Sequence, residues 1–467
     1  MNINFICLTN EIVLFVGIVI VFFYGMCFKK SPTYNHDLFI WTMWTLIMCL
    51  STCIYMNVGC TVYFLDNNFF LMPLHRIVKI FILIIAIIIV LISQTEYVSL
   101  KNFFEFYLFI LLSLLGLFLM MSANNLLLIL IFLEIQGVIA YTLTGFRSYS
   151  NISKESMVKF FILGAIITGF MGYGISIIYN VHGTTLITEL ATLLEEPQNY
   201  YLFLGLFFLW SGFLFKLAVV PFHFWIADIY QGAPLIVTLF FATISKIGFV
   251  FLVFQLIKLL NVNFLIWLIL LSMFYGTIMS LYQVKIIRLI AFSSIVNVSF
   301  ALIVFLTEAP VEIGMSYIII YSFLNVSLFL ILIMFKDKIN NVPFVELVDF
   351  SKIMKINPII SLILIMTLLS IGGIPPLAGF FIKWYVFNWL ICSNNYFLAF
   401  FFIVVGVINA VYYIRLVRLI YLNSEKQLSI ENFKNINILF LLILVLIFLI
   451  NIFFIFIHIK FLFLLII

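Results

Sequence analysis

The segment LFKLAVVPFHFW, residues 214–225, decides the fold because it places a lysine and a proline inside a long hydrophobic stretch. Lys216 is the only charged residue between Tyr200 and Val220, a stretch that otherwise has the character of a membrane-spanning helix. A lysine near the centre of such a helix costs roughly 2.5–3.5 kcal/mol on insertion scales. Pro221 follows and interrupts the helix. Because this burial is costly, we expect Lys216 either to pair with an opposite charge or to have a function.

The whole chain has the composition of a polytopic helical membrane protein. Its 467 residues are 66% hydrophobic and only 9% charged, and the mean hydropathy is +1.31. These values exclude a soluble globular protein. The apolar runs are continuous over about 20 residues, whereas the strands of a membrane β-barrel are shorter and alternate. The N-terminal MNINFICLTNE has no basic region, so we expect no cleaved targeting segment.

The sequence gives no sign of a metal, a redox centre or a nucleotide site. The six cysteines are scattered, with no Cys-x-x-Cys motif and no His/Cys cluster at ligand spacing. No glycine-rich phosphate loop, flavin or nicotinamide fingerprint or nucleophile elbow occurs. We therefore expect no cofactor in this chain and no nucleic-acid partner.

About fourteen hydrophobic spans follow one another along the chain. They lie near 11–28, 38–58, 77–93, 106–121, 125–146, 157–180, 200–231, 235–257, 264–281, 286–306, 313–335, 359–391, 396–421 and 436–457. Two of them, 200–231 and 359–391, are too long for one simple crossing of a hydrocarbon core of about 30 Å. The first contains Pro221 and the second contains SIGGIPPLAG, with Pro375 and Pro376. Paired interruptions predict broken helices and an internal repeat around an ion path.

The distribution of basic residues predicts the orientation in the membrane. Sixteen of the 23 Lys and Arg residues fall in odd-numbered connections. Even-numbered connections and the C-terminal tail carry four, namely Arg76, Lys79, Lys258 and Lys460. Because basic residues concentrate on the inner side of a membrane, both termini are expected on the outer side. The other three basic residues lie within spans.

Four ionisable residues are predicted to lie at membrane depth: Glu134, Lys216, Lys246 and Lys383. Glu134 is the only carboxylate that the pattern places in the middle of a span. Together the four groups would cost roughly 10 kcal/mol at per-residue insertion costs, and such groups normally face a protein interior or water and mark ion or proton paths.

Two interpretations of these charges are open. A buried Glu134–Lys216 pair could lock two helices together, but this leaves Lys246 and Lys383 without a carboxylate. Burial disfavours the charged form of a lysine and a nearby carboxylate favours it, so a neighbour can switch its charge. That property favours a proton relay. Weaker auxiliary candidates are His223, Asp228, Ser294 and Asn297.

Five stretches carry a resemblance to a known family. They are ESMVKFFILGAIITGFMGYGISIIYNVHGTT (155–185), LFKLAVVPFHFWIADIYQGAP (214–234), ATISKIGF (242–249), QVKIIRLIAFSSI (283–295) and LSIGGIPPLAGFFIKWYVF (369–387). In this order, and with YQGAP directly after the broken helix, the chain closely resembles the subunit 2 or subunit N family of respiratory NADH dehydrogenase (complex I). The first hundred residues and the last fifty match in hydrophobic pattern only.

The resemblance implies an all-α fold with two inverted five-helix repeats, 106–258 and 259–434, each with a broken helix. Three transmembrane helices in 1–105 would precede them and one in 435–467 would follow. The family's charged axis corresponds to Glu134, Lys216, Lys246 and Lys383 of this chain. Two positions depart from the family: Asn297 stands where many relatives place histidine, and Ala227 replaces a common proline.

The function implied by the resemblance is proton translocation coupled to NADH:ubiquinone electron transfer in other subunits. NADH, FMN, iron–sulfur clusters and ubiquinone would belong to those subunits. The expected partners are neighbouring antiporter-like and small membrane subunits and lipids. An organelle origin agrees with the abundance of Phe, Ile, Asn and Tyr, which AT-rich genomes favour, and the expected location is the mitochondrial inner membrane rather than a bacterial plasma membrane. A stand-alone cation/proton antiporter and a purely structural subunit are the alternatives.

Overall fold

The computed structural model of the chain describes residues 7–29, 33–56, 61–94, 103–147, 150–193, 200–259, 262–307, 309–335, 346–347, 353–422 and 438–454. Within these residues, twelve helical runs are long and apolar enough to cross a membrane. They are α2 Thr9–Cys27, α3 Tyr34–Tyr55, α4 Pro73–Ser93, α5 Phe103–Ser122, α6 Leu126–Thr144, α7 Asn151–His182, α9 Tyr200–Leu217, the continuous run of α11 Leu235–Phe240, η2 Phe241–Ser245 and α12 Lys246–Leu256, α13 Val262–Tyr282, α14 Ile286–Phe305, α15 Val311–Met334 and α19 Tyr396–Leu422.

Three shorter apolar helices complete the set of fourteen predicted segments. They are α17 Pro358–Gly372, α18 Ala378–Cys392 and α20 Ile438–Phe453. α17 and α18 are the two halves of the predicted interrupted span, so the prediction of a polytopic helical membrane protein is confirmed. The remaining helical pieces are short: α8 Ile187–Leu193, α10 Ile226–Gly232, η3 Ile257–Leu259 and α16 Ile353–Ile356.

A β-hairpin interrupts the all-helical pattern and was not predicted. Strands β1 Val62–Phe64 and β2 Phe69–Leu71 pair antiparallel, with Val62 opposite Leu71. The hairpin is joined to the α5–α6 connection, since Asn124 donates from its backbone to Asn68 O at 2.8 Å. The hairpin lies between α3 and α4, and its two strands have three residues each. Hydropathy averaged over a whole membrane span does not detect such short strands.

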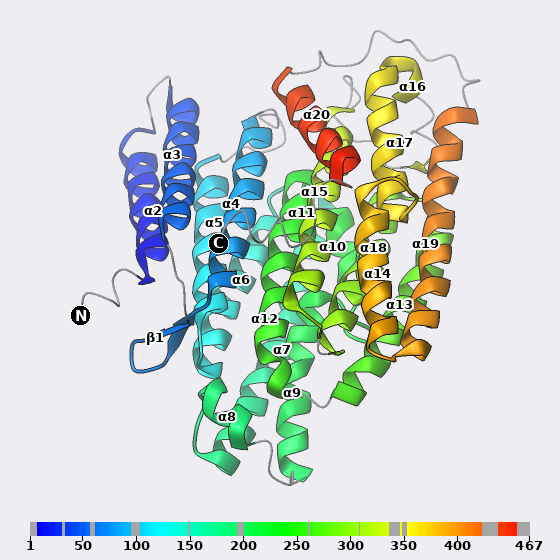
Figure 1. The fold of residues 1–467 in the computed structure, drawn as a ribbon. Helices are drawn as coiled ribbons and strands as arrows, with labels where there is room; N and C mark the ends of the chain where they lie inside the picture. The colour runs from blue at the N-terminus through cyan, green and yellow to red at the C-terminus, as the bar shows by residue number, and fades with distance from the viewer. Residues whose placement is uncertain are drawn as a thin grey trace.

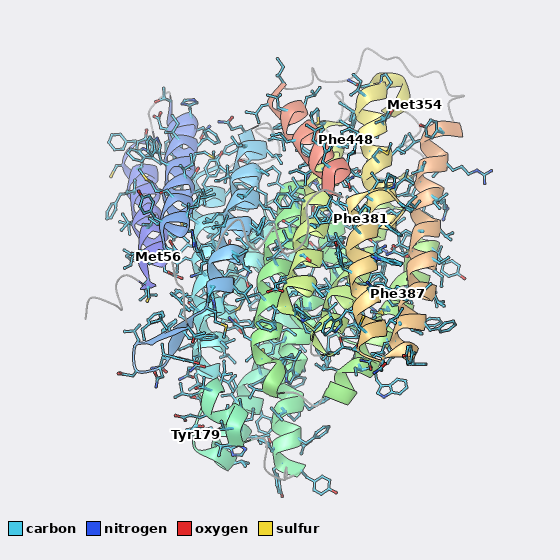
Figure 2. All side chains as sticks on the ribbon, in the orientation of Figure 1. Met56, Tyr179, Met354, Phe381, Phe387 and Phe448 are labelled. Carbon is cyan, nitrogen blue, oxygen red and sulfur yellow. The ribbon has the colours of Figure 1, made fainter. Side chains whose placement is uncertain are left out.

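The helices run roughly side by side, with α2 and α3 at one edge of the bundle and α19 at the opposite edge (Figure 1). Burial identifies the centre. In α11–α12, α14 and α15, 94%, 94% and 89% of the most apolar stretch is buried, against 33% in α3. Side chains project from the outer helices along the full height of the bundle, from Met354 near one end to Tyr179 near the other (Figure 2). These exposed apolar surfaces suit a lipid environment.

Both predicted helix breaks are present. α9 ends at Leu217, Ala218 adopts a left-handed conformation with φ of 58°, and α10 begins only at Ile226. The indole of Trp225 donates to the carbonyl of Phe215 at 2.8 Å, which satisfies one acceptor freed by the break.

The second break begins at Gly373, whose φ of 87° is a conformation that glycine adopts easily. The side chain of Asn451, on α20, bridges the two sides of this break. Its Oδ1 accepts hydrogen bonds from the hydroxyl of Ser370 at 2.7 Å and the backbone N–H of Ala378 at 3.1 Å. The two halves of the broken helix are thus joined through a third helix. The inverted relation between 106–258 and 259–434 stays a prediction.

Candidate functional site

Lys216 lies in the last turn of α9, immediately before the first break, and is only 7% exposed. Its ammonium is 5.5 Å from the ring centre of Tyr141 and 5.9 Å from that of Phe160. A methyl group added to Gly137 would lie 3.2 Å from Nζ, so the head group rests directly against α6. The surface against which the Lys216 ammonium packs therefore belongs to α6, the helix that also carries Glu134.

Glu134 is half-buried on α6, within electrostatic range of Lys216. It lies three residues before Gly137, about 4.5 Å along the helix axis. The five ion pairs found among the described residues do not include Glu134 or Lys216. Glu134 and Lys216 therefore interact electrostatically without forming an ion pair. The interpretation in which such a pair locks two helices together is not supported.

Lys246 begins α12 and is 2% exposed. Its Nζ has no hydrogen-bond partner among the described residues and lies 5.9 Å from the ring centre of Tyr230. The turn before it, η2, is π-helical. Such turns are rare and concentrate at functional sites. The local widening of the helix at this lysine was not visible in the sequence.

Lys383 is partly buried on α18 and reaches back to the second break. Its Nζ donates to the carbonyls of Ile371 and Gly372, both at 2.9 Å. These are carbonyls at the C-terminal end of α17, where the helix dipole attracts a cation. A side chain at Gly373 would meet the lysine, since a Cβ there would lie 2.8 Å from its Cδ. Lys216 and Lys383 thus both sit at a helix break.

The auxiliary candidates divide into two groups. His223, in the first break, is buried with its ring 4.3 Å from that of Tyr275. Asp228 binds Arg288 of α14 at 2.6 Å and Lys159 of α7 at 3.2 Å, so it connects α10 to both halves of the chain. Among the described residues, no hydrogen bond or ion pair joins His223 or Asp228 to Lys216, Lys246 or Lys383.

Ser294 and Asn297 do lie in the buried centre, on α14. The Ser294 hydroxyl donates to the Ala291 carbonyl at 2.6 Å. Asn297 donates from Nδ2 to the Ser293 carbonyl and accepts a hydrogen bond from the hydroxyl of Tyr317, both at 2.8 Å. Both polar atoms of the amide thus form a hydrogen bond at the position where many relatives are expected to have histidine.

One prediction about the charges was wrong. Lys79, counted above with an outer connection, lies inside α4 and is 1% exposed. It binds Glu11 of α2 at 2.6 Å, so a second carboxylate is also buried. The orientation count becomes sixteen against three, because one of the four outer residues is removed. Whether a basic residue at the boundary of a span lies in the loop or in the helix depends on its partner. The partner of Lys79 is Glu11, 68 residues away in the sequence.

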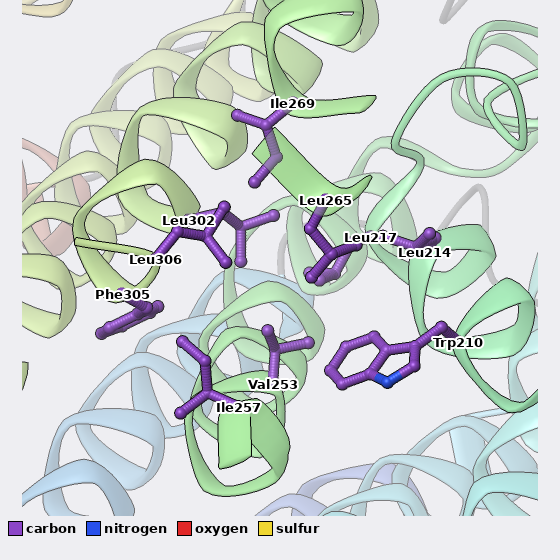
Figure 3. Close-up of a pocket in the computed structure, with 10 residues that line it drawn as sticks. All are labelled: Trp210, Leu214, Leu217, Val253, Ile257, Leu265, Ile269, Leu302, Phe305 and Leu306. Atoms are coloured by element: carbon purple, nitrogen blue, oxygen red, sulfur yellow. The ribbon is translucent and has the colours of Figure 1, made fainter. Parts of the chain in front are cut away.

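A small pocket between α9, α12, α13 and α14 is separate from these charges (Figure 3). Among its lining residues, the only polar side-chain atom is the indole nitrogen of Trp210. The lining consists of Trp210, Leu214, Leu217, Val253, Ile257, Leu265, Ile269, Leu302, Phe305 and Leu306. None of these lining residues is titratable, so none of them can act as a proton carrier. Among the described residues, no group of His, Cys, Asp or Glu is arranged to hold a metal ion.

The arrangement of broken helices around buried lysines is that of an antiporter-like membrane subunit. Residues 123–409 match the family described as NADH:quinone oxidoreductase/Mrp antiporter, transmembrane. NADH-quinone oxidoreductase subunit N of Pelagibacter ubique is 33% identical over 91% of both chains. NADH-ubiquinone oxidoreductase chain 2 of Marchantia polymorpha is 31% identical over 91% of this chain and 90% of its own.

The fold agrees with these relatives. A chain in the structure of respiratory complex I from Thermus thermophilus with bound aureothin superimposes with a TM-score of 0.81, covering 95% of this chain and 97% of that one at 24% identity. The chain therefore belongs to the family of NADH-quinone oxidoreductase subunit N and NADH-ubiquinone oxidoreductase chain 2. The resemblance drawn from the five sequence stretches is confirmed.

Proposed function

We propose that this chain is a membrane-arm subunit of respiratory complex I that translocates protons while other subunits transfer electrons from NADH to ubiquinone. The observation that carries the proposal is the series of buried lysines, two of them at helix breaks. Family membership supplies the reaction to which they would be coupled. NADH, FMN, iron–sulfur clusters and ubiquinone would be bound by the other subunits.

In this mechanism the charged axis is Glu134, Lys216, Lys246 and Lys383. A change at the contact with a neighbouring subunit alters the charge or position of Glu134. Lys216, which has no bridge to hold its ammonium, then releases its proton toward Lys246 and on to Lys383. Moving one charge against about 180 mV costs roughly 4 kcal/mol, since 100 mV corresponds to about 2.3 kcal/mol per charge. Coupling between nearby buried charges is of that size.

The geometry argues against a purely structural subunit, and the relatives argue against a stand-alone antiporter. A purely structural subunit would hold its buried charges in ion pairs, as Lys79 is held by Glu11. Lys246, however, has no hydrogen-bond partner among the described residues, and Lys216 is in none of the five ion pairs there. A stand-alone cation/proton antiporter could use the same lysines, but curated relatives that align with nine-tenths of this chain are named as oxidoreductase subunits.

The assembly and location follow from the same proposal. Neighbouring antiporter-like and small membrane subunits would contact the outer helices, together with lipids. The membrane would be the mitochondrial inner membrane, rather than a bacterial plasma membrane, with both termini on the outer side. A mild-detergent native gel of the source membranes tests the assembly. We expect mass spectrometry to find this chain in the band with NADH dehydrogenase activity, whereas recovery only in a small inactive species would favour the antiporter.

The central test is Lys216→Ala in the assembled complex, with Lys285→Ala as a control at an exposed lysine. Reconstituted vesicles report proton uptake and NADH oxidation together. We expect Lys216→Ala to lower proton translocation at least fivefold while the control pumps at the normal rate. An assembled Lys216→Ala complex with unchanged pumping contradicts the proposed function.

A further inference from the structure

Helix α20 carries a single polar side chain, and that side chain faces the bundle. The sequence of α20 is ILFLLILVLIFLINIF, and its buried residues recur every three or four positions: Phe440, Leu444, Ile447 and Asn451. This spacing places them on one face of the helix. A buried amide costs free energy unless it is hydrogen-bonded. Because Asn451 is only 1% exposed, its hydrogen bonds must offset that cost.

Asn451 and Ser370 satisfy backbone groups that the second break leaves free. Helix α18 begins at Ala378, and the first N–H groups of a helix have no partner within it. The N–H of Ala378 donates to Asn451 Oδ1 at 3.1 Å, and the N–H of Gly379 donates to Ser370 Oγ at 3.0 Å. The Ser370 hydroxyl in turn donates to Asn451 Oδ1 at 2.7 Å. We refer to these four residues as the break clamp.

The break clamp lies directly beside the Lys383 site. A Cβ on Gly379 would overlap the carbonyl oxygen of Ser370, so the backbones of α17 and α18 touch at this point. Lys383 lies four residues after Gly379, one turn further along the same face of α18. Its Nζ donates to the carbonyls of Ile371 and Gly372, the two residues that follow Ser370. The spacing of the two half-helices at the break clamp therefore decides whether the ammonium can reach both carbonyls.

We propose that Asn451 is a positioning residue for Lys383, which holds the end of α17 against the start of α18 at the spacing in which the ammonium binds both carbonyls. This inference rests on the proposed function and adds a residue of α20 to the Lys383 site. Helix α20 packs against both α17 and α18, so it contacts the two elements that it is proposed to hold. Asn451 lies outside residues 123–409, the part of the chain that matches the family.

Two variants remove the break clamp from different helices, and each has a matched control. Asn451→Leu removes the acceptor on α20 and keeps a side chain of similar length. Its control is Ile447→Ala, which removes packing from the same face one turn away. Ser370→Ala removes the hydroxyl on α17. Its control is Ser361→Ala, also buried on α17, whose hydroxyl donates only within its own helix, to the Pro358 carbonyl at 2.7 Å.

The measurement is proton translocation by the complex in vesicles over a range of pH, normalised to the amount of assembled complex on a native gel. We expect Asn451→Leu and Ser370→Ala each to lower translocation roughly threefold or more, and the double variant to be no worse than either, because both act on one unit. Each should also shift the pH dependence of translocation by about half a unit or more, because the two carbonyls help to set the charge state of Lys383. Both controls should keep the normal pH dependence.

Normal translocation by an assembled Asn451→Leu complex overturns the inference. A loss without a shift in pH dependence, equal to the loss in Ile447→Ala, also overturns it, because packing of α20 would then be the cause. If Asn451→Leu does not assemble, Ser370→Ala decides by the same two criteria, since it leaves α20 unchanged.

Lys383→Ala in parallel vesicles separates this inference from the proposed function. If Lys383→Ala lowers translocation while the two clamp variants translocate normally, only the positioning role of Asn451 is wrong. If Lys383→Ala itself translocates normally, the charged axis is wrong at Lys383, and the positioning role is wrong with it.

Discussion

At the scale of single residues, the three lysines of the proposed axis, Lys216, Lys246 and Lys383, differ in what surrounds their ammonium groups. Lys383 is solvated by two backbone carbonyls. Lys216 rests against a glycine and an aromatic ring. Lys246 has no hydrogen-bond partner among the described residues. Three residues of one type at membrane depth therefore have three different environments, and a proton carried along them moves between unequal sites.

Gly137→Ala tests how closely Lys216 must approach α6. The new Cβ would lie 3.2 Å from both Lys216 Nζ and the Tyr141 hydroxyl, so the flexible lysine head must move. Alanine is about 1 kcal/mol more favourable than glycine within a helix, so the helix itself should remain stable. We expect proton translocation by the assembled complex to fall several-fold.

Gly169→Ala is the matched control for Gly137→Ala, because nothing lies within 4 Å of its new Cβ on α7. We expect it to pump normally in the same vesicle assay. Equal pumping by the two variants would mean that the position of the ammonium against Gly137 has no functional role.

At the scale of elements, buried polar contacts connect helices that are distant in sequence. Asn451 of α20 closes the second break, and Asp228 links α10 to α7 and α14. The Glu11–Lys79 pair does the same for α2 and α4, where both side chains are almost completely buried. Because α2 and α3 form one edge of the bundle, this pair anchors the N-terminal helices to the rest (Figure 1).

Breaking the Glu11–Lys79 pair on one side should destabilise the chain more than removing both charges. Glu11→Gln leaves the Lys79 charge buried without its partner, and losses of this kind are about 3–5 kcal/mol. The double variant Glu11→Met/Lys79→Met leaves no buried charge and should be close to normal. Thermal melting of the purified complex and the amount of assembled chain are the measurements.

Glu155→Gln provides the comparison, since the Glu155–Lys159 pair has the same chemistry but is exposed, and we expect little change in melting. If the double Met variant melts as early as Glu11→Gln, the pair contributes more than mutual neutralisation, and our explanation of its role is wrong.

At the scale of the whole molecule, the proposed orientation assigns every helix end to one side of the membrane. Two exposed cysteines lie at helix ends that this orientation places on opposite sides. Cys27 ends α2 and should face the inner side, whereas Cys392 ends α18 and should face the outer side. The chain therefore carries its own reporters of topology.

A membrane-impermeant maleimide should label Cys392, and not Cys27, from the outer side of sealed membranes. Inverted vesicles should give the reverse pattern, and peptide mass spectrometry assigns each site. Detergent-solubilised complex is the control for accessibility, because both cysteines should react there. Labelling of Cys27 from the outer side would show that the orientation drawn from the basic residues is reversed.

Much of the fold was predictable because it depends on local sequence. Fourteen apolar segments predicted the helices, and Pro221 and the Pro375–Pro376 pair predicted where two of them break. The burial of Lys216 and Lys246 was predictable because each lies in a long apolar stretch that contains no other charged residue. The hairpin was missed because strands of three residues carry little hydropathy signal. Tyr317, Tyr321 and Asn325 of α15 follow one another at intervals of four residues and so share one face of the helix. This spacing was visible in the sequence, but tyrosine in an apolar helix is equally typical of an interface.

The sequence by itself therefore determined that this chain is a helical membrane protein with two broken helices and lysines at membrane depth, because span length, hydropathy and proline act locally along the chain. Only the tertiary structure decided what those lysines touch. It left Glu134 and Lys216 without an ion pair among the described residues, paired Lys79 with Glu11, and joined Asn297 of α14 to Tyr317 of α15. These contacts join helices far apart in sequence, and the packing of the helices alone sets which polar groups meet.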